Sequence, residues 1–249
     1  MHTAYQTPSG EISRLYLDMA RQPHMLIAGS TGSGKSTALH GLISAILYHS
    51  PARARLILID PKRTELTDYS NLPHTLYTAK GYNPQQWEQA LNTALSIMDC
   101  RFLEMERRHI RTYDGPDVYI IIDEYSAIAR EGGKRMYNNI MRITSEGRAA
   151  RVHCIVATQC PKANIIPTEI RENLISRLCL HTCTPTESRV LMDTAGCEKL
   201  PAYGYGYYIR PGARDLYQIP MVTEEERARL IKWWTDHPEP VRVSDRRAV

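Results

Sequence analysis

The chain lacks the long apolar stretches of a membrane protein. None of its hydrophobic runs approaches the roughly 20 residues that a transmembrane helix needs. Its opening residues, MHTAYQTPSGE, lack the basic-then-apolar order of a secretion signal. The net charge is only +4 over 249 residues, so the composition permits a polyanionic partner without requiring one. These absences predict a cytoplasmic globular protein.

The sequence also lacks the residue spacing of a metal site or a disulfide framework. None of its six cysteines form a Cys-x-x-Cys pair, and several lie in apolar stretches such as RLCLHTC. The nine histidines are scattered without ligand spacing, and His153 lies in a strand-like run. We therefore expect reduced cysteines, no structural metal, and a hydrogen-bonded core position for His153.

Short apolar runs alternate with segments of helical periodicity. The five runs that predict buried strands are 24–29, 55–60, 118–124, 152–159 and 176–181. Helices are expected after Lys35, after the cap signal Asn83-Pro84, and over about 134–149. The near-continuous hydrophobicity of the five apolar runs favours strands buried on both faces. The pattern therefore predicts an α/β domain with a mainly parallel, doubly wound sheet.

The last part of the chain changes character. Residues 204–219 predict a late β-hairpin, and Thr223 with Glu226 form a capping box for a final helix. We expect three units: a lead-in over 1–22 that packs on the main domain, a nucleotide-binding domain over 23–222, and a C-terminal helix with a mobile basic tail over 223–249.

One short motif predicts a phosphate-binding loop. Gly29, Gly34, Lys35 and Ser36 satisfy G-x-x-x-x-G-K-[ST] between a predicted strand and an amphipathic helix. Lys35 is expected at the β- and γ-phosphates of ATP and Ser36 at Mg²⁺. The residues expected to surround the nucleotide are Gly29, Ser30, Thr31, Gly32, Ser33, Gly34, Lys35, Ser36 and Thr37.

A second motif predicts hydrolysis. The apolar run VYIII ends in Asp123-Glu124, where Asp123 would complete the Mg²⁺ site and Glu124 would act as general base on the attacking water. Gln159, at the end of another strand, would reach the γ-phosphate if the two strands are neighbours. A capping role for Gln159 is equally compatible with the sequence.

These residues lie in longer segments that resemble one protein family. PHMLIAGSTGSGKST, LILIDPKRTELTDYSNLPHTL and DEYSAIAREGGKRMYNNIMRITSEGRAARVHCIVATQCP are similar to the motor domain of FtsK/SpoIIIE DNA translocases, in the FtsK–HerA group, and the similarity runs from about residue 10 to 226. The resemblance implies a RecA-like P-loop NTPase fold and a homo-hexameric ring. It also implies Mg²⁺-dependent hydrolysis of ATP to ADP and phosphate, coupled to movement of double-stranded DNA through a central pore.

The resemblance also assigns roles to individual residues. Gln159 falls on the family's sensor position, and Arg148 falls where the family presents an arginine finger to the ATP of the neighbouring subunit. Lys62 and Arg189 are further candidates for the same subunit interface. Without the resemblance, Arg148 would pass for an ordinary charge near a helix end.

Two segments are expected to face DNA, 62–70 and the loop 130–135. Residues 130–151 hold six basic and two acidic residues, a local net charge of +4 that equals that of the whole chain. REGGKR has no aromatic residue for stacking bases, which favours duplex over single-stranded DNA. The predicted DNA-phosphate contacts are Lys62, Arg63, Arg130, Lys134 and Arg135.

Three alternatives remain at this stage. The chain could be a conjugation-type coupling ATPase for single-stranded DNA or nucleoprotein, a protein-export ATPase of the type VII secretion kind, or a scaffold that binds nucleotide without turnover. The complete set of hydrolytic residues disfavours the scaffold. The 249 residues leave no room for the membrane anchor and winged-helix module of larger family members, so we expect a minimal translocase, with any recruiting partner undetermined.

Overall fold

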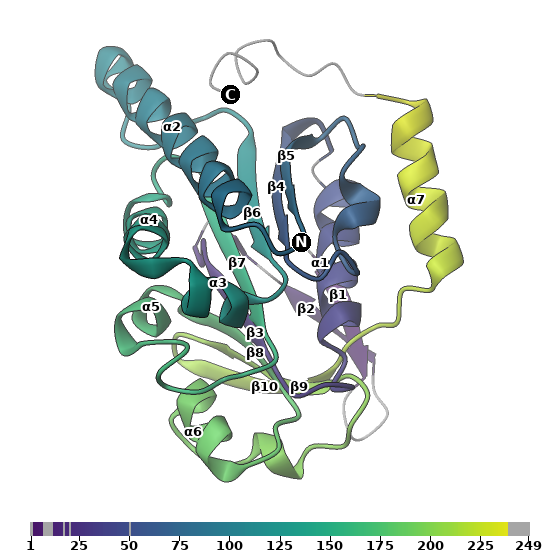
Figure 1. The fold of residues 1–249 in the computed structure, drawn as a ribbon. Helices are drawn as coiled ribbons and strands as arrows, with labels where there is room; N and C mark the ends of the chain where they lie inside the picture. The colour runs from purple at the N-terminus through teal and green to yellow at the C-terminus, as the bar shows by residue number, and fades with distance from the viewer. Residues whose placement is uncertain (1, 7–11, 17, 20, 50, 239–249) are drawn as a thin grey trace.

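The computed structural model describes residues 2–6, 12–16, 18–19, 21–49 and 51–238. Its centre is an eight-stranded sheet with the order β10-β9-β8-β3-β7-β6-β4-β5 (Figure 1). The strands are β3 (Met25–Ala28), β4 (Ala54–Asp60), β5 (Thr75–Lys80), β6 (Asp117–Ile122), β7 (Val152–Thr158), β8 (Ser176–Leu180), β9 (Tyr205–Arg210) and β10 (Ala213–Gln218). The five predicted strands are all present.

The six strands β8, β3, β7, β6, β4 and β5 are parallel to one another. The hairpin β9–β10 extends the sheet through an antiparallel pairing of β9 with β8. Every residue of β3, β4, β6 and β7 is buried. This double-sided burial explains why the sequence shows continuous apolar runs rather than alternation. The predicted α/β class with a late hairpin is therefore confirmed.

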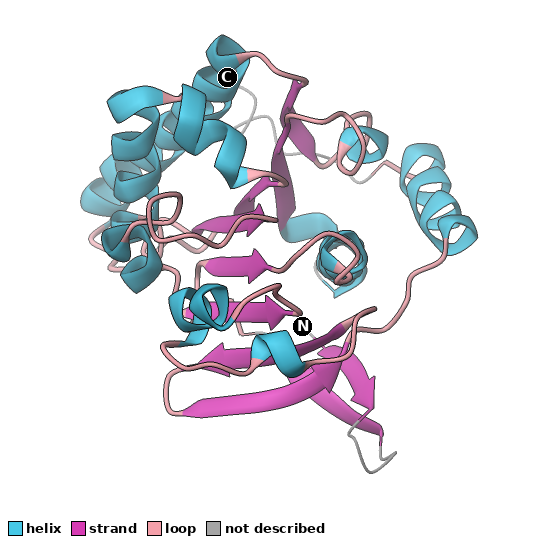
Figure 2. Cartoon of the chain, turned by 60° about the horizontal axis from the view of Figure 1, so that its bottom comes forward, coloured by secondary structure: helices cyan, strands magenta, loops and turns pink. Residues whose placement is uncertain are grey.

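Helices cover both faces of the sheet (Figure 2). One face carries α1 (Lys35–His49) and α7 (Glu224–Asp236), whose buried side chains share one hydrophobic cluster with the sheet. The helices on the opposite face are α2 (Pro84–Arg108), α3 (Tyr125–Glu131), α4 (Gly133–Glu146), α5 (Thr168–Asn173) and α6 (Pro185–Met192). The fold is thus a three-layer sandwich with one core on each side of the sheet.

Local signals define several helix ends as expected. The Asn83 side chain caps α2 by accepting a hydrogen bond from the Gln86 backbone N–H, and Thr223 with Glu226 forms the predicted capping box of α7. The prediction of a loop over 130–135 is wrong, because only Gly132 separates the two helices. Arg130 lies in the last turn of α3, and Lys134 and Arg135 lie in the first turn of α4.

The N-terminal segment forms a separate antiparallel hairpin, β1 (His2–Gln6) with β2 (Ile12–Tyr16), and β1 contacts β10 and α1. The predicted mobile tail falls mostly on residues 239–249, outside the described part of the chain. Within the described ranges, no helix combines the length and apolar character that a bilayer crossing requires.

Candidate nucleotide-hydrolysis site

The sheet order brings the two predicted motifs together. β7 lies between β3, which leads into the phosphate loop, and β6, which leads into Asp123 and Glu124. Because these three strands are parallel, their carboxyl ends meet at one edge of the sheet, where such folds bind ligands. Gln159, one residue after β7, therefore lies between the phosphate loop and the acidic pair.

Main-chain contacts hold the phosphate loop in place. The Ser30 N–H donates to the His181 carbonyl at 2.8 Å, and the Gly204 N–H donates to the Ser33 carbonyl at 2.9 Å. Gly34 adopts a φ of +99°, and a Cβ there would lie 2.9 Å from the Gly204 backbone. Only glycine satisfies both the conformation and this close approach, so the loop packs directly against the lead-in to β9.

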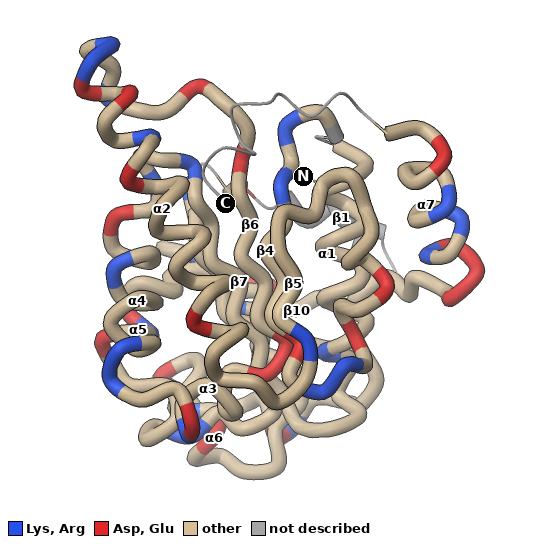
Figure 3. Tube along the Cα trace, turned by 45° about the horizontal axis from the view of Figure 1, so that its top comes forward, with Lys and Arg blue, Asp and Glu red and all other residues tan. Residues whose placement is uncertain are grey.

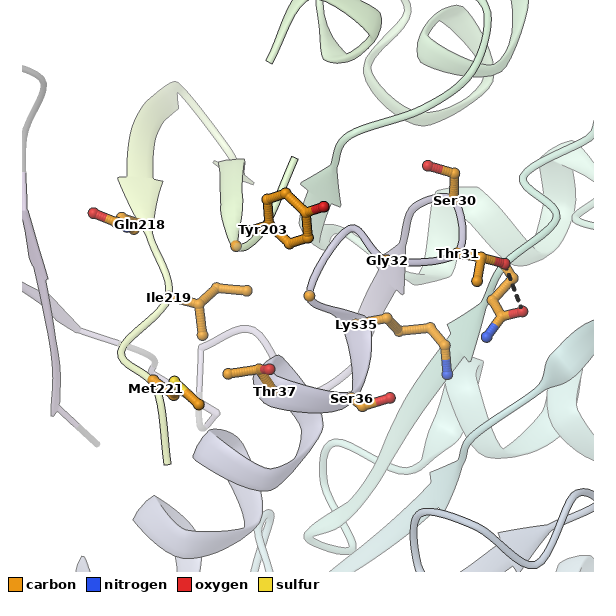
Figure 4. A pocket seen from close by; sticks show the side chains of 13 residues that line it. Ser30, Thr31, Gly32, Lys35, Ser36, Thr37, Tyr203, Gln218, Ile219 and Met221 are labelled. Carbon is orange, nitrogen blue, oxygen red and sulfur yellow. Dashed lines mark hydrogen bonds between the residues drawn. The ribbon is translucent and has the colours of Figure 1, made fainter. Parts of the chain in front are cut away.

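A cavity of about 470 Å³ opens beside this loop. Tyr203, Ile219 and Met221 face the loop residues across it (Figure 4). The side chains of Tyr203 and Met221 are 82% and 78% exposed, so this wall presents apolar surface to the opening. The sequence predicted only a hairpin here and missed this wall, because its residues lie some 170 positions from the phosphate loop.

Lys35 and Asp123 form a buried ion pair. The Lys35 ammonium contacts the Asp123 carboxylate and also donates to the Asp123 carbonyl at 3.0 Å. Burial raises the pKa of Asp123, and the adjacent Lys35 only partly offsets this. The other carboxylate oxygen, Oδ2, is buried without a hydrogen-bond partner among the described residues. An orphaned carboxylate oxygen here fits a hydrated Mg²⁺, which prefers oxygen donors.

The Glu124 carboxylate is almost fully engaged. Its Oε1 accepts from the Ser126 hydroxyl at 2.8 Å, the Thr158 hydroxyl at 3.0 Å and the Gln159 N–H at 3.3 Å. Its Oε2 is 3.1 Å from the Lys62 ammonium. Burial raises the pKa of Glu124, but the Ser126 hydroxyl and the Lys62 ammonium outweigh it and hold the pKa below the ordinary glutamate value. The carboxylate is ionised at neutral pH, and within the described residues both of its oxygens have partners, with Oε2 facing Lys62.

Lys62 therefore lies in the nucleotide site of its own subunit. Its ammonium also lies 3.2 Å from the Gln159 side-chain oxygen, which accepts a longer hydrogen bond of 3.4 Å from the Thr31 hydroxyl (Figure 4). The sequence predicts a contact of Lys62 to DNA or to a neighbouring subunit. Within its own subunit, Lys62 forms one network with Glu124 and Gln159, just after β4.

Arg148 lies near the amino end of β7, at the end of the strands opposite the phosphate loop. It precedes β7, whereas Gln159 follows it, and the seven residues of β7 separate the two by roughly 20 Å. The side chain is exposed and lines a cavity of about 420 Å³ together with Arg151 and His153. Arg148 therefore cannot reach the phosphate loop of its own chain. His153 itself is buried and bonded to the Pro23 carbonyl and the Asp117 carboxylate, as expected for a core histidine.

Fewer basic residues of 130–151 are free to contact DNA phosphates than their number suggests, because several form ion pairs within the chain. Arg135 pairs with Glu88 at 2.6 Å, Arg151 with Asp117 at 2.6 Å, and Arg142 with Asp99. Along α2, acidic and basic positions are interspersed (Figure 3). Of the six basic residues, those that form no ion pair within the described ranges are Arg130, Lys134 and Arg148.

The two remaining predicted positions lie on exposed surface. Arg63 has a φ of +60° and folds its guanidinium against Gly81, beside the start of α2. Arg189 is exposed on α6, which follows β8. Neither residue contacts the phosphate loop of its own subunit in the described structure.

Comparison with known proteins agrees with this architecture. Residues 8–131 match the FtsK/SpoIIIE family. The chain is 36% identical over 236 residues to the DNA translocase FtsK of Leptospira interrogans, covering 87% of this chain and 25% of that protein. It is 34% identical over 249 residues to that of Streptomyces coelicolor, covering 90% and 27%. The chain thus spans about a quarter of the length of these relatives.

Solved structures share the fold at lower identity. The cytoplasmic domain of the Thermomonospora curvata type VII secretion ATPase EccC superposes with a TM-score of 0.81 at 22% identity, covering 95% of this chain and 31% of that one. The pCW3 conjugation coupling protein TcpA gives 0.78 at 16% identity, covering 93% and 70%. Both support the RecA-like P-loop ATPase fold, in agreement with the sequence-based expectation.

Proposed function

Because this chain belongs to the FtsK/SpoIIIE family, we propose that it is a Mg²⁺-dependent ATPase that moves double-stranded DNA through the pore of a homo-hexameric ring. One observation carries the hydrolytic part of the proposal: Glu124 directly follows Asp123, the partner of Lys35, and its ionised carboxylate is joined through Lys62 to Gln159, which lines the cavity beside the phosphate loop. A scaffold that only bound nucleotide would not need a buried carboxylate held beside the phosphate loop.

In this proposal the cavity beside the phosphate loop holds ATP. The loop N–H groups and Lys35 bind the phosphates, and the wall of Tyr203, Ile219 and Met221 covers the base. Ser36 and Asp123 would hold Mg²⁺, which would supply positive charge beside the phosphates. Glu124 orients a water and takes its proton, and Gln159 contacts the γ-phosphate side of the same water.

The position of Arg148 is the reason for proposing that several copies of the chain assemble. Its exposed guanidinium, at the sheet edge opposite the phosphate loop, can stabilise transferred phosphate only in the site of a second copy. Head-to-tail contact of this kind forms a ring when the rotation between successive copies closes, as the proposal requires. Arg189, exposed on α6, is a second candidate for that interface.

The DNA part rests on the curated relatives and on a few free charges. The relatives at 34–36% identity are named DNA translocases. Arg130 and Lys134, exposed and outside any ion pair within the described ranges, are the first candidates for backbone contacts, followed by Arg63 and Lys62. Arg135 would have to leave Glu88 first. Contacts to phosphates carry no sequence information, which suits a motor.

The first experiment is a steady-state ATPase assay without DNA, with linear duplex and with single-stranded DNA, using Lys35→Ala as the blank. We expect duplex DNA to raise the rate several-fold, and the stimulation to fall between about 50 and 200 mM salt as counterion release weakens. Stronger stimulation by single strands would favour the coupling-ATPase alternative. A rate indifferent to both nucleic acids would contradict the DNA proposal and favour a polypeptide substrate.

A substitution at Lys62 tests whether it restrains the base. In Lys62→Met, Glu124 loses its ion pair, and we expect the DNA-independent ATPase rate to rise about two- to five-fold, since a half-exposed ion pair contributes about 0.5–1 kcal/mol. Lys162→Met, an exposed lysine beyond Gln159, is the matched control and should leave the rate unchanged. A tenfold loss in Lys62→Met would instead show that Lys62 assists the reaction.

A further inference from the structure

The turn that carries Arg148 is closed by main-chain hydrogen bonds. It occupies residues 147–151, between α4 and β7. The Val152 N–H donates to the Gly147 carbonyl at 2.9 Å, and the Arg151 N–H donates to the Arg148 carbonyl at 3.2 Å. A Cβ on Gly147 would lie 2.4 Å from the Val152 carbonyl oxygen, so only glycine fits there. The backbone on both sides of Arg148 is therefore fixed, whereas its side chain is exposed.

A buried arginine of α2 contacts the end of this turn. Arg101 is only 3% exposed, and its Nη1 donates to the Ala150 carbonyl at 2.8 Å and to the Arg151 carbonyl at 3.3 Å. A buried guanidinium is costly without acceptors, and charged donors form the stronger hydrogen bonds. Arg101 and the two carbonyls therefore stabilise one another, and α2 is tied to the turn.

Tyr113, between α2 and β6, makes a second connection to the same turn. Its backbone N–H donates to the Ala149 carbonyl at 2.8 Å. The guanidinium carbon of Arg101 lies 4.5 Å from the centre of the Tyr113 ring, which is within the range of a cation–π contact. Arg101 and Tyr113 together thus hold three consecutive carbonyl groups of the turn, those of residues 149–151.

Arg151 ends the turn in an uncommon backbone conformation. Its φ is +55°, in the left-handed region that favours glycine. Its guanidinium pairs at 2.6 Å with the buried Asp117 carboxylate, which also bonds to His153 at 2.8 Å. Such a backbone persists only where its surroundings hold it. The ion pair with Asp117 is therefore a further support of the turn, independent of α2.

Arg148 differs from the residues around it, because its guanidinium is exposed and forms no ion pair within the described ranges. A side chain that must meet a phosphate in another subunit needs a fixed base, since a misplacement of about 1 Å can cost about 10²-fold in rate. We propose that Arg101 of α2 is a positioning residue for Arg148. Through the carbonyls of the turn, it fixes the direction in which Arg148 extends toward the neighbouring nucleotide. This inference rests on the proposed function and deepens it.

A double-mutant cycle tests whether Arg101 acts through Arg148. Arg101→Met keeps the length of the side chain but removes its donors, and we expect turnover at saturating ATP to fall about 10- to 100-fold, with KM within about two-fold of wild type. In an Arg148→Ala background the same substitution should change the residual turnover less than about two-fold, because no guanidinium is left to position. Arg101→Lys, which keeps a charged donor, should recover part of the loss. Arg107→Met, exposed in the last turn of α2, is the matched control and should have no effect in either background.

Mixing of subunits adds a measurement that a merely destabilised protein would not change in this way. Arg101→Met subunits should regain turnover with Lys35→Ala subunits, which supply an intact Arg148, but not with Arg148→Ala subunits. Thermal unfolding checks that each variant is folded. If Arg101→Met is not, Arg151→Gln takes its place, because it removes the ion pair with Asp117 from a half-buried position. We expect a several-fold loss from it, again absent in the Arg148→Ala background.

Wild-type turnover in folded Arg101→Met would overturn the inference and leave the ATPase proposal intact. An equal loss in the wild-type and Arg148→Ala backgrounds would also overturn it, because Arg101 would then act apart from Arg148. Wild-type turnover in Arg148→Ala would overturn the proposed arginine finger and the inference with it. Absence of ATP turnover in the wild-type chain would instead overturn the proposed function.

Discussion

Glu124→Gln should lower ATP turnover by about 10²- to 10⁴-fold and leave nucleotide affinity within a few-fold of wild type. The amide keeps the size of the side chain and can still accept from Ser126 and Thr158, so the local structure survives. What it loses is the ability to take a proton from water. Single-turnover kinetics and analogue binding, measured on the same preparation, separate the two effects.

The matched control for this substitution is Glu131→Gln, at the exposed end of α3. It removes the same charge from the same segment without touching the cleft, and its turnover should equal that of wild type. Near-normal turnover in Glu124→Gln would place the general base elsewhere. Tight binding with slow turnover would also make the variant a useful trap for the ATP-bound ring.

Arg148→Ala should lose about 10³-fold in turnover while binding nucleotide normally, because an arginine finger stabilises charge only during phosphoryl transfer. The position of the side chain, roughly 20 Å from Gln159 along β7, makes the expected defect one of the neighbouring site. Arg142→Ala, which removes a paired arginine from α4, should retain wild-type turnover.

Mixing two inactive variants tests the position in trans. Lys35→Ala subunits have a defective phosphate loop but an intact Arg148, and Arg148→Ala subunits have the reverse. We expect mixtures to regain part of the turnover, since some interfaces then combine a working loop with a working arginine. A mixture as inactive as both parents would contradict an arginine shared between copies.

Much of the fold could be predicted because local signals and burial agree. Strands covered on both faces must be apolar throughout, and this made β4, β6 and β7 visible in the sequence. Asn83 and Thr223 marked helix starts because their side chains satisfy free backbone N–H groups there. The phosphate loop and Asp123-Glu124 were found for the same reason: each motif is contiguous and follows a strand.

Features that depend on distant contacts could not be predicted. The charge pattern of 130–151 gave no sign that Arg135 would pair with Glu88 or Arg142 with Asp99, since these partners are more than 40 residues away. The placement of Lys62 over Glu124 depends on β4 and β6 being neighbours. The apolar wall of the nucleotide cavity arises from the return of the chain at Tyr203, which no local pattern announces.

The central position of β7 has a mechanical consequence. The strand is buried along its whole length and hydrogen-bonded on both sides, to β3 and to β6, so it cannot bend or slide independently. In the proposed ring, Gln159 at one end of this rod touches the phosphate of its own subunit and Arg148 at the other end serves the next. If β7 shifts together with its neighbouring strands when phosphate leaves, the turn that carries Arg148 moves with it. A stiff rod that spans two catalytic centres would let each hydrolysis event set the timing of the next one around the ring.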